Sequence, residues 1–110
     1  MTNYRQALID KIDCNVEQSE VIAGKIRTAC LSGEQGFPVV VLHGAGAGAV
    51  TWYPLIGAIS KNFCVIAPDI VGYGESDKPN AAYDRPYFAT WLKDFFSAMD
   101  ISKAHIVGLS

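Results

Sequence analysis

Residues 39–49 read VVVLHGAGAGA, and this stretch decides the fold class. Its first four residues, Val39–Leu42, form an unbroken run of β-branched and apolar side chains. Such runs are typical of strands that are buried on both faces, as in parallel sheets covered by helices. Glycine then alternates with alanine, so the chain leaves the predicted strand through a loop of very small residues. The stretch predicts an α/β protein whose functional site lies where its strands end.

Strands and helices are also expected on both sides of this strand. The extended runs Val16–Ile22 and Lys25–Leu31, with Ala23-Gly24 between them, predict an antiparallel hairpin. Strand–helix–strand spacing after Leu42 predicts two crossovers and a mostly parallel sheet. The remaining expected elements are a short amphipathic helix over Asn3–Asp13, a helix that starts at Thr51, a strand over Phe63–Ala67, a helix that starts near Pro86, and a strand over His105–Leu109.

Composition and charge exclude several classes of function. The 110 residues are 50% hydrophobic and 18% charged, which is typical of a compact domain, and residues 1–110 are expected to form the N-terminal part of a single one. Nine basic and eleven acidic residues, with no basic run, argue against nucleic acid or an anionic membrane as a partner. Charged residues interrupt the first 16 positions, so a signal peptide is not indicated and a cytoplasmic location is expected. Cys14, Cys30 and Cys64 form no C-x-x-C pair, so neither a disulfide framework nor a zinc site is expected.

Three clusters of small or polar residues follow the three expected buried strands. They are His43–Ala49, Asp69–Ser76 and Gly108–Ser110, and they contain H-G-x-G, D-x-x-G-x-G-x-S and an opening G-x-S. Each motif alone is weak evidence. In this order, at the ends of successive strands, they resemble the α/β-hydrolase superfamily, and the resemblance runs from Val16 to the end of the chain. The expected fold is therefore an α/β-hydrolase fold with an N-terminal antiparallel hairpin, truncated at the nucleophile elbow.

The resemblance implies roles for five residues around the reacting carbonyl. Ser110 would be the nucleophile, raised above the sheet by a strained turn that Gly108 permits. The backbone N–H of Ala45 would donate to the oxyanion, and Gly44 and Gly46 would let main chain approach the substrate carbonyl. A small-molecule substrate is expected, with no metal and no organic cofactor.

Other residues are expected to have structural roles or to indicate which branch of the family the chain resembles. His43 precedes the nucleophile in the chain, whereas the catalytic histidine of the family follows it, so His43 should orient the loop. Asp69 should shape a turn by accepting backbone N–H bonds. Serine rather than aspartate at the elbow argues against the haloalkane dehalogenase and epoxide hydrolase branches. The loop His43–Ala49 is also close to the H-G-G-G-x-G-A loop of the hydrolases that cleave C–C bonds in meta-cleavage products.

The order of the family's triad has a consequence for this chain. Nucleophile, acid and histidine follow one another in sequence, so the acid and the histidine are expected beyond Ser110, in the remainder of the same hydrolase chain. Residues 1–110 alone are then expected to be inactive. They would also expose an apolar edge at the strand His105–Leu109.

Two other classes of function stay open at this point. Gly44–Ala49 also satisfies the G-x-G-x-x-[GA] dinucleotide fingerprint, and Asp69 follows the next strand, where such proteins bind ribose. The fingerprint does not explain His43, the hairpin or G-x-S. The third class is a noncatalytic fragment that serves structure or partner binding.

Overall fold

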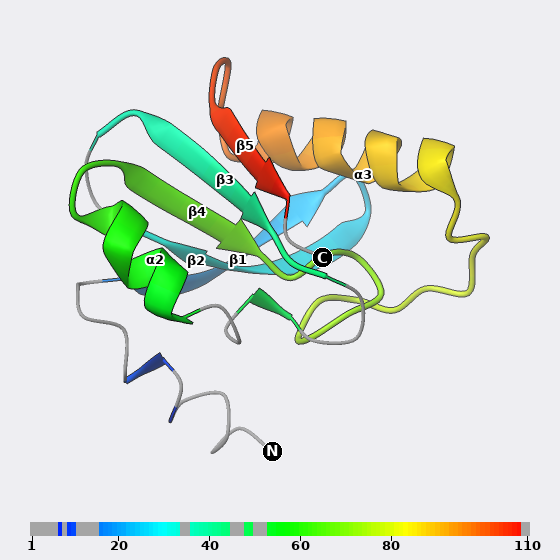
Figure 1. Cartoon of the computed structure of the whole chain (residues 1–110). Helices are drawn as coiled ribbons and strands as arrows, with labels where there is room; N and C mark the ends of the chain where they lie inside the picture. Colours follow the sequence, from blue (N-terminus) through cyan, green and yellow to red (C-terminus); the bar gives the residue numbers. More distant parts are fainter. Residues whose placement is uncertain are drawn as a thin grey trace.

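A computed structural model describes residues 7, 9–10, 16–33, 36–44, 48–49 and 53–108. One five-stranded sheet, with strand order β1-β2-β4-β3-β5, forms the centre of this part of the chain (Figure 1). β1 (Glu17–Ala23) and β2 (Ile26–Ser32) form the expected hairpin, and β2 pairs antiparallel with β4 (Cys64–Pro68). β3 (Pro38–Leu42) pairs in parallel with β4 and with β5 (His105–Gly108). The sheet is therefore mixed, with its parallel part at β4-β3-β5.

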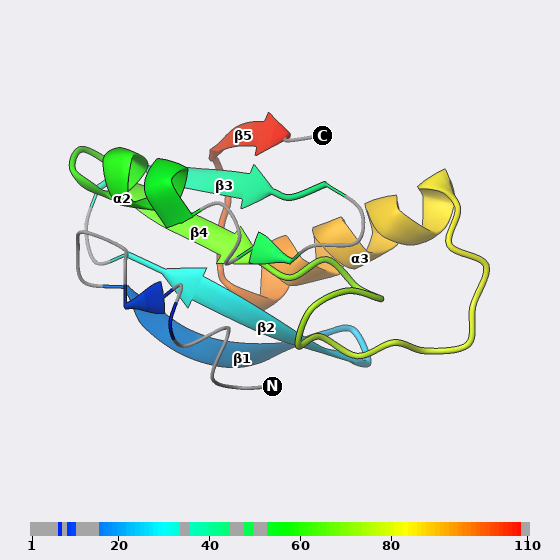
Figure 2. The same ribbon diagram turned by 60° about the horizontal axis from the view of Figure 1, so that its bottom comes forward.

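The two described helices cover opposite faces of the sheet (Figure 2). Ile56 of α2 (Tyr53–Ser60) packs in a core cluster with Val39 and Val41 of β3. Trp91 and Phe95 of α3 (Arg85–Ala98) pack on the other side, in a cluster with Val40. Alternate residues of β3 thus enter both cores, which explains the unbroken apolar run.

Element ends differ from the expected ones by one or two residues for identifiable reasons. The hairpin turn lies at Gly24-Lys25 rather than Ala23-Gly24, since Ala23 pairs with Ile26. Gly24 has φ +65° at the first central position, which is where type II′ turns require glycine. α3 starts one residue before Pro86 because the side chain of Asp84 caps it, accepting the N–H of Tyr87 at 3.0 Å.

Two further expectations concern residues that the structure describes only in part. The expected helix over Asn3–Asp13 falls mostly outside the described residues, within which Ala7 and Ile9 are helical. Thr51, expected to begin the helix after β3, also lies outside them. In the described parts of the chain, no helix combines the length and apolar character that crossing a bilayer requires. The cytoplasmic location stays a prediction.

Candidate active site

The carboxyl ends of β3 and β4 define the candidate site. These two neighbouring strands run parallel, so the loops that follow Leu42 and Pro68 leave the sheet at the same edge. The chain after β3 continues into α2 on one face, and the chain after β4 continues into α3 on the other. Open α/β sheets bind their ligands outside the carboxyl ends of their strands, which is where both of these loops lie.

His43 is bonded through both nitrogens of its ring. Nε2 accepts the N–H of Ile70 at 2.9 Å, and Nδ1 lies 2.6 Å from the carbonyl oxygen of Gly44. Because Nε2 accepts, the proton of the neutral ring lies on Nδ1, which donates to Gly44. The side chain is 4% exposed and meets the ring of Tyr73 edge-on. His43 therefore joins the loops after β3 and β4, in agreement with its expected structural role.

Asp69 also connects the two loops. Its side chain is completely buried. Oδ1 accepts the N–H of Ala49 at 2.7 Å, and Oδ2 accepts the N–H of Glu75 at 2.9 Å. The bond to Glu75 confirms that Asp69 shapes the turn after β4. The bond to Ala49, in the loop after β3, was not expected from the sequence.

Glycines let both loops close on this carboxylate. Gly48 and Gly74 have φ angles of +101° and +56°, a region that residues with side chains rarely adopt. A Cβ on Gly48 would lie 3.4 Å from Oδ1 of Asp69, and one on Gly74 would overlap its carboxylate. The second glycine of the D-x-x-G-x-G-x-S motif is therefore needed because a side chain at Gly74 would collide with the Asp69 carboxylate.

The turn after β4 is fixed to β2 by two side chains. Ser76 is buried, and its Oγ accepts the N–H of Ala29 at 2.9 Å and donates to the carbonyl of Asp69 at 2.6 Å. Asp77 accepts the N–H of Arg27 at 2.9 Å, and its carboxylate lies 3.3 Å from Nε of Arg27. The D-x-x-G-x-G-x-S motif thus ends in contacts that hold the turn against the hairpin.

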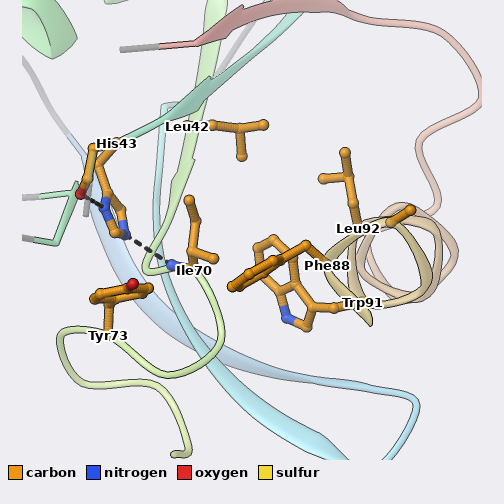
Figure 3. A pocket seen from close by; sticks show the side chains of 9 residues that line it. Leu42, His43, Ile70, Tyr73, Phe88, Trp91 and Leu92 are labelled. Carbon is orange, nitrogen blue, oxygen red and sulfur yellow. Dashed lines mark hydrogen bonds between the residues drawn. The ribbon is translucent and has the colours of Figure 1, made fainter. Parts of the chain in front are cut away.

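An apolar cavity of about 350 Å³ opens beside the two loops (Figure 3). Leu42, His43 and Ile70 form one side of it, and side chains of α3 form the other. Both ring nitrogens of His43 and the indole N–H of Trp91 are already hydrogen-bonded, so the lining is predominantly apolar. The nine lining residues are Leu42, His43, Gly44, Ile70, Tyr73, Phe88, Ala89, Trp91 and Leu92.

A group of tyrosines lies near this cavity. Tyr83 packs against Tyr87 and against Phe88, which lines the cavity. Partial desolvation raises the pKa of the Tyr83 phenol, and the neighbouring Tyr87 and Tyr73 raise it further. The phenol is therefore neutral at physiological pH. Within the described ranges, no three His, Cys, Asp or Glu side chains come close enough together to hold a metal ion.

The predicted chemical residues divide between described and undescribed positions. Ser110, Ala45 and Gly46 lie outside the described residues. Gly44 is described: it is half-buried, lines the cavity and accepts from His43. Gly108 ends β5, and a Cβ there would meet no atom of the described residues within 4 Å. Its expected steric role in the following turn stays a prediction.

The geometry of Asp69 argues against a dinucleotide site. In that class, the acidic residue after the second strand must reach the ribose hydroxyls with its carboxylate. Here the carboxylate is fully buried, and each oxygen already accepts a backbone N–H. Asp69 therefore cannot serve as the ribose ligand, and the fingerprint in Gly44–Ala49 loses its main support.

The fold, the strand order and the loops at the carboxyl ends of β3 and β4 together define an α/β hydrolase core. A family model described as alpha/beta hydrolase fold matches residues 38–110, and the chain belongs to this family. The resemblance seen in the three motifs is thereby confirmed.

Individual relatives catalyse different hydrolyses. The chain is 33% identical over 114 residues to the 2-hydroxy-6-oxo-6-(2'-aminophenyl)hexa-2,4-dienoic acid hydrolase of Metapseudomonas resinovorans, with 100% of this chain and 39% of that protein covered. It is 36% identical over 73 residues to a soluble epoxide hydrolase of a Corynebacterium species, covering 66% of this chain and 26% of that protein. The crystal structure of naproxen esterase from Bacillus subtilis matches with a TM-score of 0.87 at 29% identity, covering 99% of this chain and 38% of that one. The chain thus spans between about a quarter and two fifths of the length of these relatives.

Proposed function

We propose that this chain supplies the nucleophile and part of the oxyanion hole of a serine hydrolase that acts on an ester or another carbonyl substrate. Ser110 Oγ adds to the carbonyl carbon while its proton passes to a histidine base. The N–H of Ala45 stabilises the oxyanion, and Gly44 and Gly46 leave room for the substrate. The adduct collapses to an acyl-enzyme as the leaving group takes up that proton, and water then hydrolyses the acyl-enzyme.

The parallel register of β3 and β5 carries the proposal. Leu42 pairs with Gly108, and Gly44 and Ser110 each follow that pair by two residues. Neighbouring strands lie about 4.8 Å apart, so the segments that leave them start side by side. This arrangement supports a nucleophile and an oxyanion donor that face one substrate carbonyl. The apolar cavity beside Gly44 supports a substrate with an uncharged apolar group.

We infer the remaining triad members from the order of the family. The acid and the histidine follow the nucleophile in sequence, so we place both after Ser110 in the same protein. The greater length of the relatives supports this inference. Tests of the nucleophile, of the substrate class and of positioning residues therefore require the full-length protein that contains residues 1–110.

Labelling by a fluorophosphonate probe tests the nucleophile. The probe reacts with activated serines, so the wild-type protein should be labelled and the Ser110→Ala variant should not. Ser102→Ala is the matched control, because Ser102 is an exposed serine before β5, away from the loops of the site. Full labelling of Ser110→Ala would remove the assignment.

A C–C bond hydrolase is the second candidate, favoured by the loop His43–Ala49. Its small residues suit a backbone that wraps a flat dienol and donates N–H bonds to developing oxyanions. The relative from Metapseudomonas resinovorans, a dienoic acid hydrolase, points the same way. A ring-cleavage dienol and p-nitrophenyl acetate should be compared side by side. Fast ester hydrolysis without loss of the dienol's visible absorbance would exclude this candidate and leave the serine hydrolase intact.

A further inference from the structure

The buried carboxylate of Asp69 holds one backbone N–H from each loop of the site. Ala49 belongs to the loop after β3, and Glu75 to the turn after β4. We propose that Asp69 is a positioning residue of the active site, which fixes the loop after β3 in the geometry that oxyanion stabilisation needs. This inference rests on the proposed function and adds to it a residue outside the triad.

The bonds of Asp69 are suited to holding a loop rather than to contacting a substrate. Its side chain is 0% exposed, so a substrate cannot reach it. Both oxygens accept N–H bonds of 2.9 Å or less, which is the range of charge-assisted hydrogen bonds. Gly48 and Gly74 precede the two donors, and neither has a side chain that would crowd the carboxylate. A neutral side chain of the same size cannot accept both bonds.

The position of Ala49 relates this carboxylate to the reaction. The loop after β3 begins at His43, whose ring binds the Gly44 carbonyl, and Asp69 holds it at Ala49. A donor in a loop held at both ends needs little reorganisation when the oxyanion forms. Loss of the bond at Ala49 would make the position of the donor less well fixed. The energetic cost would appear mainly in the transition state, where negative charge develops on the oxyanion. The substitution should therefore destabilise the transition state more than it weakens substrate binding.

The Asp69→Asn variant of the full-length protein tests this role. An amide has one acceptor oxygen, so whichever way it turns, one loop loses its bond. We expect the rate constant of fluorophosphonate labelling and kcat for a p-nitrophenyl ester to fall about 10- to 100-fold, up to the effect of deleting one oxyanion donor. KM and the final labelled fraction should stay near the wild-type values. A residue that only supports the fold would lower the labelled fraction instead.

Ser76→Ala is the matched control. This variant perturbs the same turn, where it removes the bonds to Ala29 and to the carbonyl of Asp69, but it leaves the Asp69 carboxylate in place. It should lose stability and keep the labelling rate. If Asp69→Asn fails to fold, Gly48→Ala strains the same loop next to Ala49, because residues with a side chain rarely adopt the φ of +101° found at Gly48.

Each outcome of this experiment decides one question. A selective fall in rate for Asp69→Asn, or for Gly48→Ala in its place, supports the positioning role. The positioning role is overturned if Asp69→Asn labels and turns over at the wild-type rate, or if Ser76→Ala lowers these rates equally. Either result leaves the proposed function unchanged. An unlabelled wild-type protein overturns the proposed function itself.

Discussion

Ala29 of β2 donates its backbone N–H to the hydroxyl of Ser76, in the turn after β4, at 2.9 Å. The two residues lie 47 positions apart in sequence, and both are buried. The same hydroxyl donates to the carbonyl of Asp69 at 2.6 Å. One serine side chain therefore joins the hairpin to the turn that carries Asp69, and its effect on stability can be measured.

Ser76→Ala should lower the free energy of unfolding by about 1–3 kcal/mol, since it leaves the buried Ala29 N–H without this acceptor. Urea denaturation followed by circular dichroism measures the change. The control is Glu75→Ala at the neighbouring position. Glu75 is exposed and bonds to Asp69 only through its backbone N–H in this contact, so the substitution keeps the bond. That control should stay within about 0.5 kcal/mol of wild type. Equal effects of the two substitutions would contradict the assigned role of the hydroxyl.

Gly74→Ala should destabilise the protein more than Gly24→Ala. Both glycines have positive φ, of +56° and +65°, so alanine is strained at either, by about 1–2 kcal/mol. At Gly74 the new Cβ would also lie 3.0 Å from Cβ of the buried Asp69, against its carboxylate. At Gly24 it would meet only the end of the partly exposed Asp94 side chain, which can move. Thermal unfolding of the two variants gives the comparison, and a smaller loss at Gly74 would show that Asp69 yields.

The sequence predicted the fold where local patterns determine it. The apolar run Val39–Leu42 predicted a strand buried on both faces. The structure confirms this, because alternate residues of the strand enter the two cores. Antiparallel pairing of β2 with β4 could not be predicted in this way. Cys30 meets Pro68 there, and no periodicity in either segment encodes a contact between residues so distant in the chain.

The candidate site was predictable in position but not in its internal bonds. The motifs placed functional loops after β3 and β4, and the structure brings them together. Asp69 was expected to bond within its own turn, as short polar side chains commonly do. Its bond to Ala49 depends on how two parallel strands end side by side, which is a tertiary property. The sequence signal that pointed to it was an aspartate directly after a buried strand.

Thr28→Val should cost about 1–3 kcal/mol of stability, although it nearly conserves volume. The indole Nε1 of Trp91 donates to Thr28 Oγ1 at 3.0 Å, and both residues are buried. Valine would leave this N–H unsatisfied inside the core cluster between the sheet and α3. Thr28→Ser, which keeps the hydroxyl, is the matched control and should cost less.

A double-mutant cycle sharpens this prediction. Trp91→Phe removes the donor, so adding Thr28→Val to it should cost less than Thr28→Val alone. Denaturant midpoints of the four proteins give the coupling energy. Strict additivity would mean that the indole hydrogen bond contributes nothing.

Residues 1–110 produced alone should self-associate and show no hydrolase activity. β5 lies at the end of the sheet, and Ile106 on it is 52% exposed. An apolar edge strand offers unpaired backbone groups to another copy. Size-exclusion chromatography with light scattering measures the association, and an ester assay measures the activity.

Ile106→Lys should reduce this association, because a charged side chain on an edge strand opposes pairing between copies. Ser102→Lys adds the same charge at an exposed position outside β5 and serves as the control. If both lysines reduce association equally, net charge rather than the edge strand controls it. A monodisperse wild-type fragment that unfolds cooperatively and hydrolyses esters above the buffer rate would contradict the expectation that residues after Ser110 complete the sheet and the triad.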